Sequence, residues 1–145
     1  MDADTVERRT RSRLDRQAIL DGAHPPQIVA MFDEGALHRP VGGPAVMAEQ
    51  CRRLVELAQR PHIHIQVIPT SAGAHAGLAG GFILASGSYG HVAHLDDPLR
   101  AHVVSAADDI DTLFAKWEAV RAVALPTSQS SDMILRMVET WEHQT

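Results

Sequence analysis

The sequence contains one cysteine, few aromatic residues and no hydrophobic run long enough to cross a membrane. Cys51 cannot form an intramolecular disulfide, so we expect a protein of the reducing cytoplasm. The N-terminus is acidic and then rich in arginine, with no apolar segment directly after it, so nothing there indicates export. We therefore expect no membrane contact.

Several catalytic signatures are also missing. No serine lies in a G-x-S-x-G elbow, and no His-Glu-x-x-His motif offers metal ligands. The glycine-rich segment 73–81 contains no lysine, which argues against a Walker-type nucleotide loop. We therefore predict no metal site and no cofactor.

The composition itself is that of an ordinary globular domain. The 145 residues are 45% hydrophobic and 21% charged, and the formal net charge is -5. This length supports one core, so we predict a single domain over residues 1–145. The negative balance predicts no polyanionic partner.

Hydrophobic periodicity divides the domain into three parts. Residues 1–20 are predicted to form an arginine-rich helix, whose arginines we interpret as a solvated face rather than a nucleic-acid surface. Residues 28–104 are predicted to form a sheet with one crossover helix, and residues 105–143 two further helices. The predicted fold class is α+β, a mixed β-sheet of about five strands with helices packed against it. The predicted strands are residues 28–32, 62–68, 82–86, 91–95 and 99–104.

The segment 60–82 is the most informative part of the chain. Two prolines bracket residues 62–68, in which apolar and polar side chains alternate as in a half-buried strand. Glycines then crowd residues 73–81, so a loop is expected before the next strand. We predict a binding cleft between this strand, this loop and the loop 37–43.

Histidines are the obvious candidates for chemistry. His62 and His64 would project from one face of their strand and could give two imidazoles to a metal, but no cysteine or glutamate stands at a recognisable ligand spacing. A histidine general acid or base in a pocket is the stronger option. If the protein is an enzyme, the candidates are His62, His64 and His94, oriented by Asp33 or Glu34. These histidines could equally be solvent-facing strand residues.

Three segments of the chain carry a resemblance to a known family. They read DEGALHRPVGGPAVMAEQ at 33–50, RPHIHIQVIPTSAGAHAGL at 60–78 and RAVALPTSQS at 121–130. From about Arg13 to the last helix, the chain resembles the C-terminal domain of unknown function of actinobacterial XRE-type helix-turn-helix regulators, an antitoxin-like set often paired with a small partner protein. The resemblance implies a sensory or partner-binding domain behind a DNA-binding head.

Two features depart from this family. No helix-turn-helix precedes Arg13, and we do not expect DNA binding without that head. His62, His64 and His94 stand where the family more often has polar or small side chains, or tyrosine at position 94, whereas His75 in G-A-H-A-G is typical.

We therefore predict a stand-alone regulatory domain that binds a small molecule or a partner protein, with a homodimer as a further option. The candidate ligand-binding residues are Arg39, Gly42, Gly43, His75, Phe82 and Tyr89. The alternative is a small-molecule enzyme of a biosynthetic pathway, of cyclase or isomerase type, which would use the histidines as acid and base.

Overall fold

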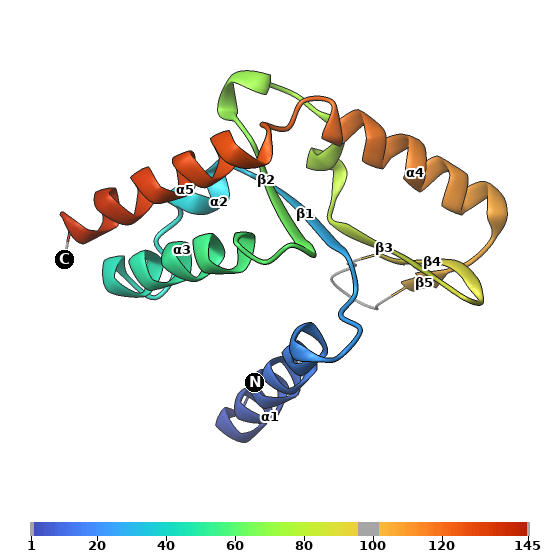
Figure 1. Ribbon diagram of the computed structural model, residues 1–145, viewed down its shortest axis with the longest axis horizontal. Helices are drawn as coiled ribbons and strands as arrows, with labels where there is room; N and C mark the ends of the chain where they lie inside the picture. The colour runs from blue at the N-terminus through green and yellow to red at the C-terminus, as the bar shows by residue number, and fades with distance from the viewer. Residues whose placement is uncertain (1, 96–101, 145) are drawn as a thin grey trace.

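The computed structural model describes residues 2–95 and 102–144 (Figure 1). The α-helices in these ranges are α1 (Ala3–Gln17), α2 (Gly35–His38), α3 (Pro44–Ala58), α4 (Ala107–Arg121) and α5 (Thr127–Glu142). The strands are β1 (Ile28–Asp33), β2 (Ile63–Ile68), β3 (Phe82–Gly87), β4 (Gly90–Leu95) and β5 (His102–Val104). Short 3-10 helices are η1 (Ala18–Asp21), η2 (Thr70–Ala72) and η3 (Ala76–Ala79). The predicted α+β class and its five strands are confirmed.

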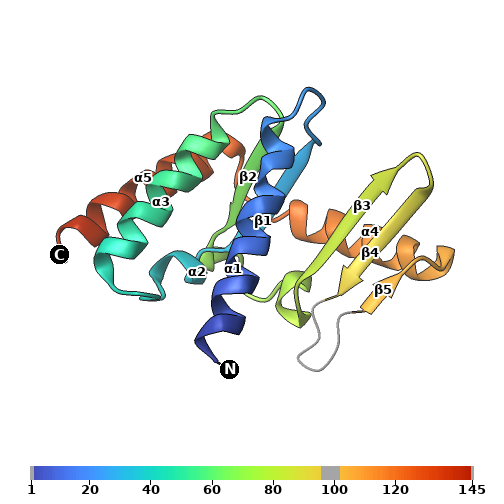
Figure 2. The same cartoon turned by 90° about the horizontal axis from the view of Figure 1, so that it is seen from below.

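The strands form two sheets instead of the single mixed sheet that we expected. β1 and β2 pair in parallel, and α3 is the crossover between them, whereas β3, β4 and β5 form an antiparallel sheet in that order. In Figure 2 the strands lie in the order β2, β1, β3, β4, β5, and β1 does not pair with β3. The division coincides with a long-range contact, because η3, just before β3, packs against α4.

The predicted fifth strand, residues 99–104, is only partly covered. Its end is observed as β5, which pairs with β4. Residues 96–101 lie outside the described part of the chain.

The main core lies in a first lobe, which consists of β1, β2, α2, α3 and α5. One face of the parallel sheet packs against α3 and α5, and Trp141 of α5 donates its indole N–H to the Leu37 carbonyl over 2.9 Å. The buried residues of this core are Leu37, Met47, Ala48, Cys51, Ile63, Ile65, Val67, Ile134, Met137, Val138 and Trp141. Burial of each large side chain contributes about 1.5–3 kcal/mol, so this lobe holds most of the stability.

A second lobe consists of β3, β4, β5, η3 and α4. Helix α4 covers one face of the antiparallel sheet, where Ala93, Ile110 and Val120 are buried. On the other face the side chains of Ile83 and Val103 remain 64% and 72% exposed. The second lobe therefore has a much smaller core than the first.

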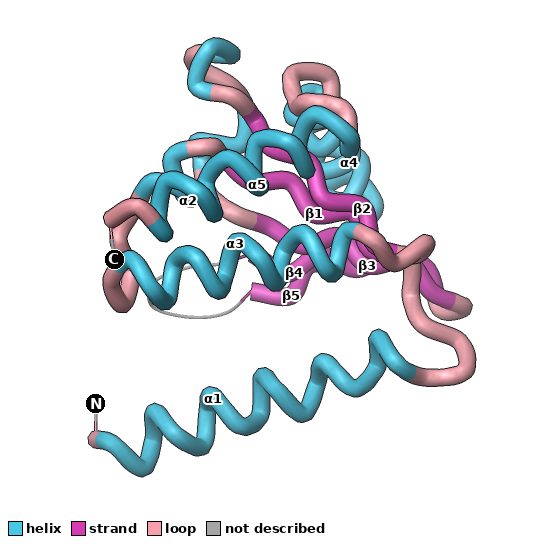
Figure 3. The backbone as a smooth tube through the Cα atoms, turned by 60° about the vertical axis from the view of Figure 1, so that its left-hand side comes forward, coloured by secondary structure: helices cyan, strands magenta, loops and turns pink. Residues whose placement is uncertain are grey.

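Helix α1 projects away from both lobes (Figures 1 and 3). Within the described residues its substantial contacts are with η1, and its apolar side chains Val6 and Leu14 are exposed. The predicted N-terminal helix is thus present, as α1 followed by η1, but it is not part of the core. None of the described helices combines the length and the apolar character needed to cross a membrane.

Candidate functional site

A groove separates the two sheets. It has two adjoining parts, with volumes of about 250 and 530 Å³, and both parts are lined by Met31, Phe82 and Trp117. The larger part is also lined by Gln27, Ile28, Val29, Ala30, Ile83, Leu84, Ser86 and Phe114. The smaller part is also lined by Phe32, Asp33, Ile68, His75, Gly77, Leu78, Gly80, Gly81 and Val120. We call the two parts together the inter-sheet groove.

The smaller part of the groove is built around His75. Its side chain is only 4% exposed, and its Nε2 lies 3.3 Å from Oδ2 of Asp33. The backbone N–H of Gly77 donates to Nδ1 over 3.2 Å, so Nδ1 is the acceptor and Nε2 carries the proton that faces Asp33. Both ring nitrogens are engaged, and His75 ties the glycine-rich loop to the end of β1.

Gly77 is required for this close approach. A Cβ atom at Gly77 would lie 3.0 Å from two atoms of the His75 ring, which is closer than side chains normally pack. The glycine-rich sequence therefore lets the loop fold back on its own histidine.

Asp33 supplies the charge of the groove. The backbone N–H of Gly35 donates to its Oδ1 over 2.7 Å, and this bond, followed by the one with His75, lowers the pKa of the Asp33 carboxyl from its ordinary value. The side chain is still 41% exposed, so the carboxylate remains reachable. Of the described residues that line the groove, Asp33 is the one with a charged side chain. Lys116 lies near the wall, with its Nζ 5.2 Å from the centre of the Phe82 ring.

The neighbouring carboxylate has a different role. Glu34 Oε2 accepts hydrogen bonds from the backbone N–H of Thr70 over 2.7 Å and from its hydroxyl over 3.0 Å. Oε1 of Glu34 lies 3.5 Å from Nε2 of His38. The Thr70 backbone N–H is the main cause of a lowered pKa at Glu34, against the opposing effect of burial. Glu34 thus ties the end of β1 to η2 and does not line the groove.

The predicted ligand-binding residues are divided by the structure. His75 and Phe82 line the groove, as does Asp33, but Arg39, Gly42 and Gly43 lie in the turn before α3 and Tyr89 is fully exposed in the β3–β4 turn. Gly42 and Gly43 have φ angles of 77° and 93°, which residues with a side chain rarely adopt. Glycine at these two positions therefore allows the turn before α3. None of the residues of the predicted wall at 37–43 lines the groove, and Leu37 belongs to the core of the first lobe, where its carbonyl accepts the Trp141 indole N–H.

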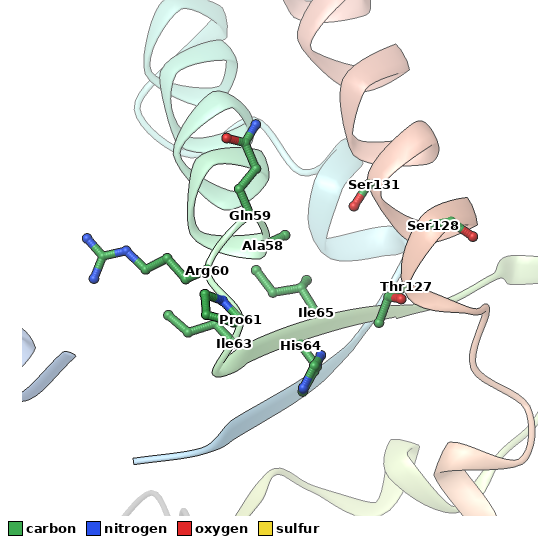
Figure 4. Close-up of a pocket in the computed structure, with 10 residues that line it drawn as sticks. All are labelled: Ala58, Gln59, Arg60, Pro61, Ile63, His64, Ile65, Thr127, Ser128 and Ser131. Atoms are coloured by element: carbon green, nitrogen blue, oxygen red, sulfur yellow. The ribbon is translucent and has the colours of Figure 1, made fainter. Parts of the chain in front are cut away.

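The candidate catalytic histidines do not meet at one point. His64 is exposed and lines a separate hollow of about 310 Å³ with Thr127, Ser128 and Ser131 at the start of α5 (Figure 4). His94 lies in β4, in register between Ile83 and Val103 of the neighbouring strands.

His62 lies just before β2, and its buried Nε2 has no hydrogen-bond partner in the described structure. Within residues 2–95 and 102–144, no three histidine, cysteine or acidic side chains gather as a metal would need.

Sequence reasoning missed Met31 and Trp117. Trp117 lies on the apolar stripe of α4, and that spacing shows only that it faces the sheets. The sequence carries no signal for this role, because the role depends on the break between β1 and β3, which leaves the side chains of Met31 and Trp117 half-buried.

One comparison with known proteins gives a match. The model of a family described as a domain of unknown function (DUF5753) matches residues 1–136. The searches of curated proteins and of solved structures gave no significant match.

Proposed function

We propose, from the geometry of the inter-sheet groove, that this chain is a non-enzymatic binding domain. The chain belongs to the DUF5753 family, whose description assigns no function. The ligand, a small apolar molecule or an apolar segment of a partner protein, binds in the inter-sheet groove. The domain serves a regulator of XRE type in antitoxin-like or transcriptional control in the cytoplasm, as the sequence resemblance implies.

One observation carries this proposal. Met31, Phe82 and Trp117 are only partly buried, and they line a groove that also presents the ionised carboxylate of Asp33. Ligand sites are typically concave and mostly apolar, with a few polar groups that orient the ligand. The groove matches that description, and Asp33 favours a ligand with a cationic or hydrogen-bond-donating group.

Catalysis has no comparable support. Both nitrogens of His75 have partners, and none of the other described histidines lines the groove. A general base needs a nitrogen within reach of its substrate. The cyclase or isomerase alternative therefore stays a prediction from the sequence.

Two glycine variants test the proposal. Gly81 lines the groove, whereas Gly87 lies at the end of β3 outside it, and a Cβ atom at either position meets nothing within 4 Å. Gly81→Phe should place a bulky ring at the groove, and Gly87→Phe is the matched control. The probe is Nile red, an uncharged apolar dye, whose fluorescence is titrated with each protein.

The groove should bind the dye in the wild type and in Gly87→Phe. Gly81→Phe should weaken binding about tenfold, which corresponds to roughly 1.4 kcal/mol. Equal binding by all three proteins, or no binding by the wild type, would overturn the groove as the site.

A further inference from the structure

The edge of β1 that faces the groove presents unused backbone groups. The N–H of Ile28 donates to His62 O over 2.8 Å, and that of Glu34 donates to Ile68 O over 2.9 Å. Along a strand, successive residues direct their backbone groups to opposite sides, so those of Val29 and Met31 point away from β2. They point toward the groove that these two residues line.

The edge of β3 is arranged in the same way. Gly87 and Gly90 are paired across a two-residue turn, so their backbone groups are directed at each other. By alternation, the N–H and C=O groups of Phe82, Leu84 and Ser86 point away from β4, and all three residues line the groove. Two strand edges therefore border one groove.

Side chains alone do not explain this lining. Residues 27–31 and 82–84 line the larger part consecutively, although neighbouring side chains on a strand point to opposite faces. A groove lined by consecutive residues of β1 and of β3 is expected where it runs along the backbone edges of these strands.

The opposite edge of the parallel sheet is capped at Val67 in β2. The N–H of Val67 donates to Ser130 Oγ over 3.0 Å, and the Val67 carbonyl accepts from the N–H of Leu125 over 2.9 Å. Among the described residues, no comparable hydrogen bond caps the edges of β1 and β3 that face the groove. Open edges are normally covered or blocked, so these two edges are suited to pairing.

We propose that the groove binds an extended peptide segment of a partner protein, which pairs with β1 and β3 as an added strand and joins the two sheets into one. Its alternate side chains are apolar and pack against Met31, Phe82 and Trp117. The inference rests on the proposed function and identifies its ligand, because only a polypeptide backbone offers donors and acceptors to two facing edges along their length.

The negative charge of Asp33 predicts that the peptide carries a basic residue. Asp33 stands at the end of β1 and carries the negative charge of the groove. A lysine or arginine side chain at one end of the segment would meet this carboxylate. The preferred partner is thus an extended apolar segment with a basic residue at one end.

The first experiment uses a library of acetylated eight-residue peptides. Each peptide alternates valine, isoleucine or leucine with threonine, carries one lysine near an end, and is measured by fluorescence anisotropy. The best binder is then methylated at one backbone nitrogen at a time, which removes single donors without altering the protein.

Because an added strand is bonded on both sides, methylation at each central position should weaken binding about tenfold, or roughly 1.4 kcal/mol. Sensitivity at every second position only would place the peptide on one edge and overturn the joining of the sheets.

The second experiment locates the peptide on the protein. Hydrogen exchange followed by NMR should show the amides of Met31 and Leu84 slowing when the peptide binds. Asp33→Asn should weaken the lysine peptide about tenfold and its threonine counterpart hardly at all. Asp132→Asn, in α5 and outside the groove, is the matched control and should bind both peptides as the wild type does.

The outcomes separate this inference from the proposed function. If no peptide binds, or methylation has no effect and the two amides do not slow, while Gly81→Phe still weakens dye binding, the groove remains a ligand site and the added strand is wrong. If neither dye nor peptide binds in the groove, both proposals fail.

Discussion

At Ser130 one hydroxyl caps the outer edge of β2 at Val67. The side chain is completely buried, and its Oγ accepts the Val67 N–H over 3.0 Å and donates to Leu125 O over 3.3 Å. Ser130→Ala would leave a buried N–H without a partner, which costs about 1–3 kcal/mol. Urea unfolding followed by tryptophan fluorescence should show this loss.

Ser128→Ala is the matched control, because Ser128 is exposed on the same helix. Its effect should stay within about 0.5 kcal/mol, as is usual for surface substitutions. Equal losses in the two variants would show that the hydroxyl of Ser130 does not hold the edge of β2.

Glu34 should make the protein sensitive to acid. Its pKa in the folded state lies below the ordinary 4.5, chiefly because the Thr70 N–H stabilises the carboxylate, so the unfolded chain takes up a proton at higher pH than the folded one. The stability that Glu34 contributes is therefore present above about pH 4.5 and is lost as the pH falls through the folded-state value. Chemical unfolding between pH 7 and pH 3 should show a smaller loss for Glu34→Gln than for the wild type.

Thr70→Val provides the control for Glu34. This variant removes the hydroxyl bond but keeps the backbone N–H that dominates the shift, so its pH dependence should fall between the other two. If Glu34→Gln follows the wild-type curve throughout, the bond between β1 and η2 does not contribute to acid stability.

Individual histidines mark the limit of what the sequence could predict. His62, His64 and His94 attracted attention because of their strand positions, yet they lie in separate surroundings. His75 was placed correctly in the glycine-rich loop, but its spacing could not show that Asp33, 42 residues away, would lie beside it. Alternation gives the face of a strand, whereas side-chain partners depend on how the elements pack.

Among the elements, the strands and the longer helices followed from local patterns with small shifts at their ends, whereas the short helix α2 was not predicted. Helix α3 lies between β1 and β2 as the predicted crossover helix, and Ile28 pairs with Ile63 in parallel. The break between β1 and β3 had no local signal, because both strands have ordinary apolar sequences. It coincides with contacts between η3 and α4, which lie far apart in the chain.

Helix α1 should contribute little to the stability of the rest. Its apolar side chains are exposed, and an isolated helix of this length is only marginally stable in water. Removal of residues 1–17 should therefore shift the thermal midpoint, measured by calorimetry, by no more than about 2 °C. A fall of about 5 °C or more would mean that α1 packs against the lobes in solution.

Removal of residues 1–21 is the matched comparison. It also deletes η1, in which Leu20 packs against the core and Asp21 pairs with Arg60 over 2.7 Å. Loss of that packing should cost about 1–3 kcal/mol, so the longer deletion should be clearly less stable than the shorter one. Similar midpoints for the two deletions would show that η1 does not anchor the N-terminal segment.

At the scale of the whole molecule, the two lobes share no sheet, and their cores differ greatly in size. Asp33 with His75 connects β1 to the glycine-rich loop, and that loop leads into the second lobe. Regions with few buried apolar contacts open at lower free energy than the global unfolding. We therefore expect the second lobe to open before the first.

Native-state hydrogen exchange at low urea concentrations measures this difference. Amides bonded within the antiparallel sheet, such as Ala85 and Val92, should open at least about 1–2 kcal/mol more easily than the amide of Val67 in β2. His75→Ala should widen the gap, because it releases the loop that positions the second lobe and leaves the first core untouched. His64→Ala is the exposed control and should leave both lobes unchanged. Equal opening free energies throughout would show a single cooperative unit, and the groove would then be a fixed feature of one core instead of a seam between two.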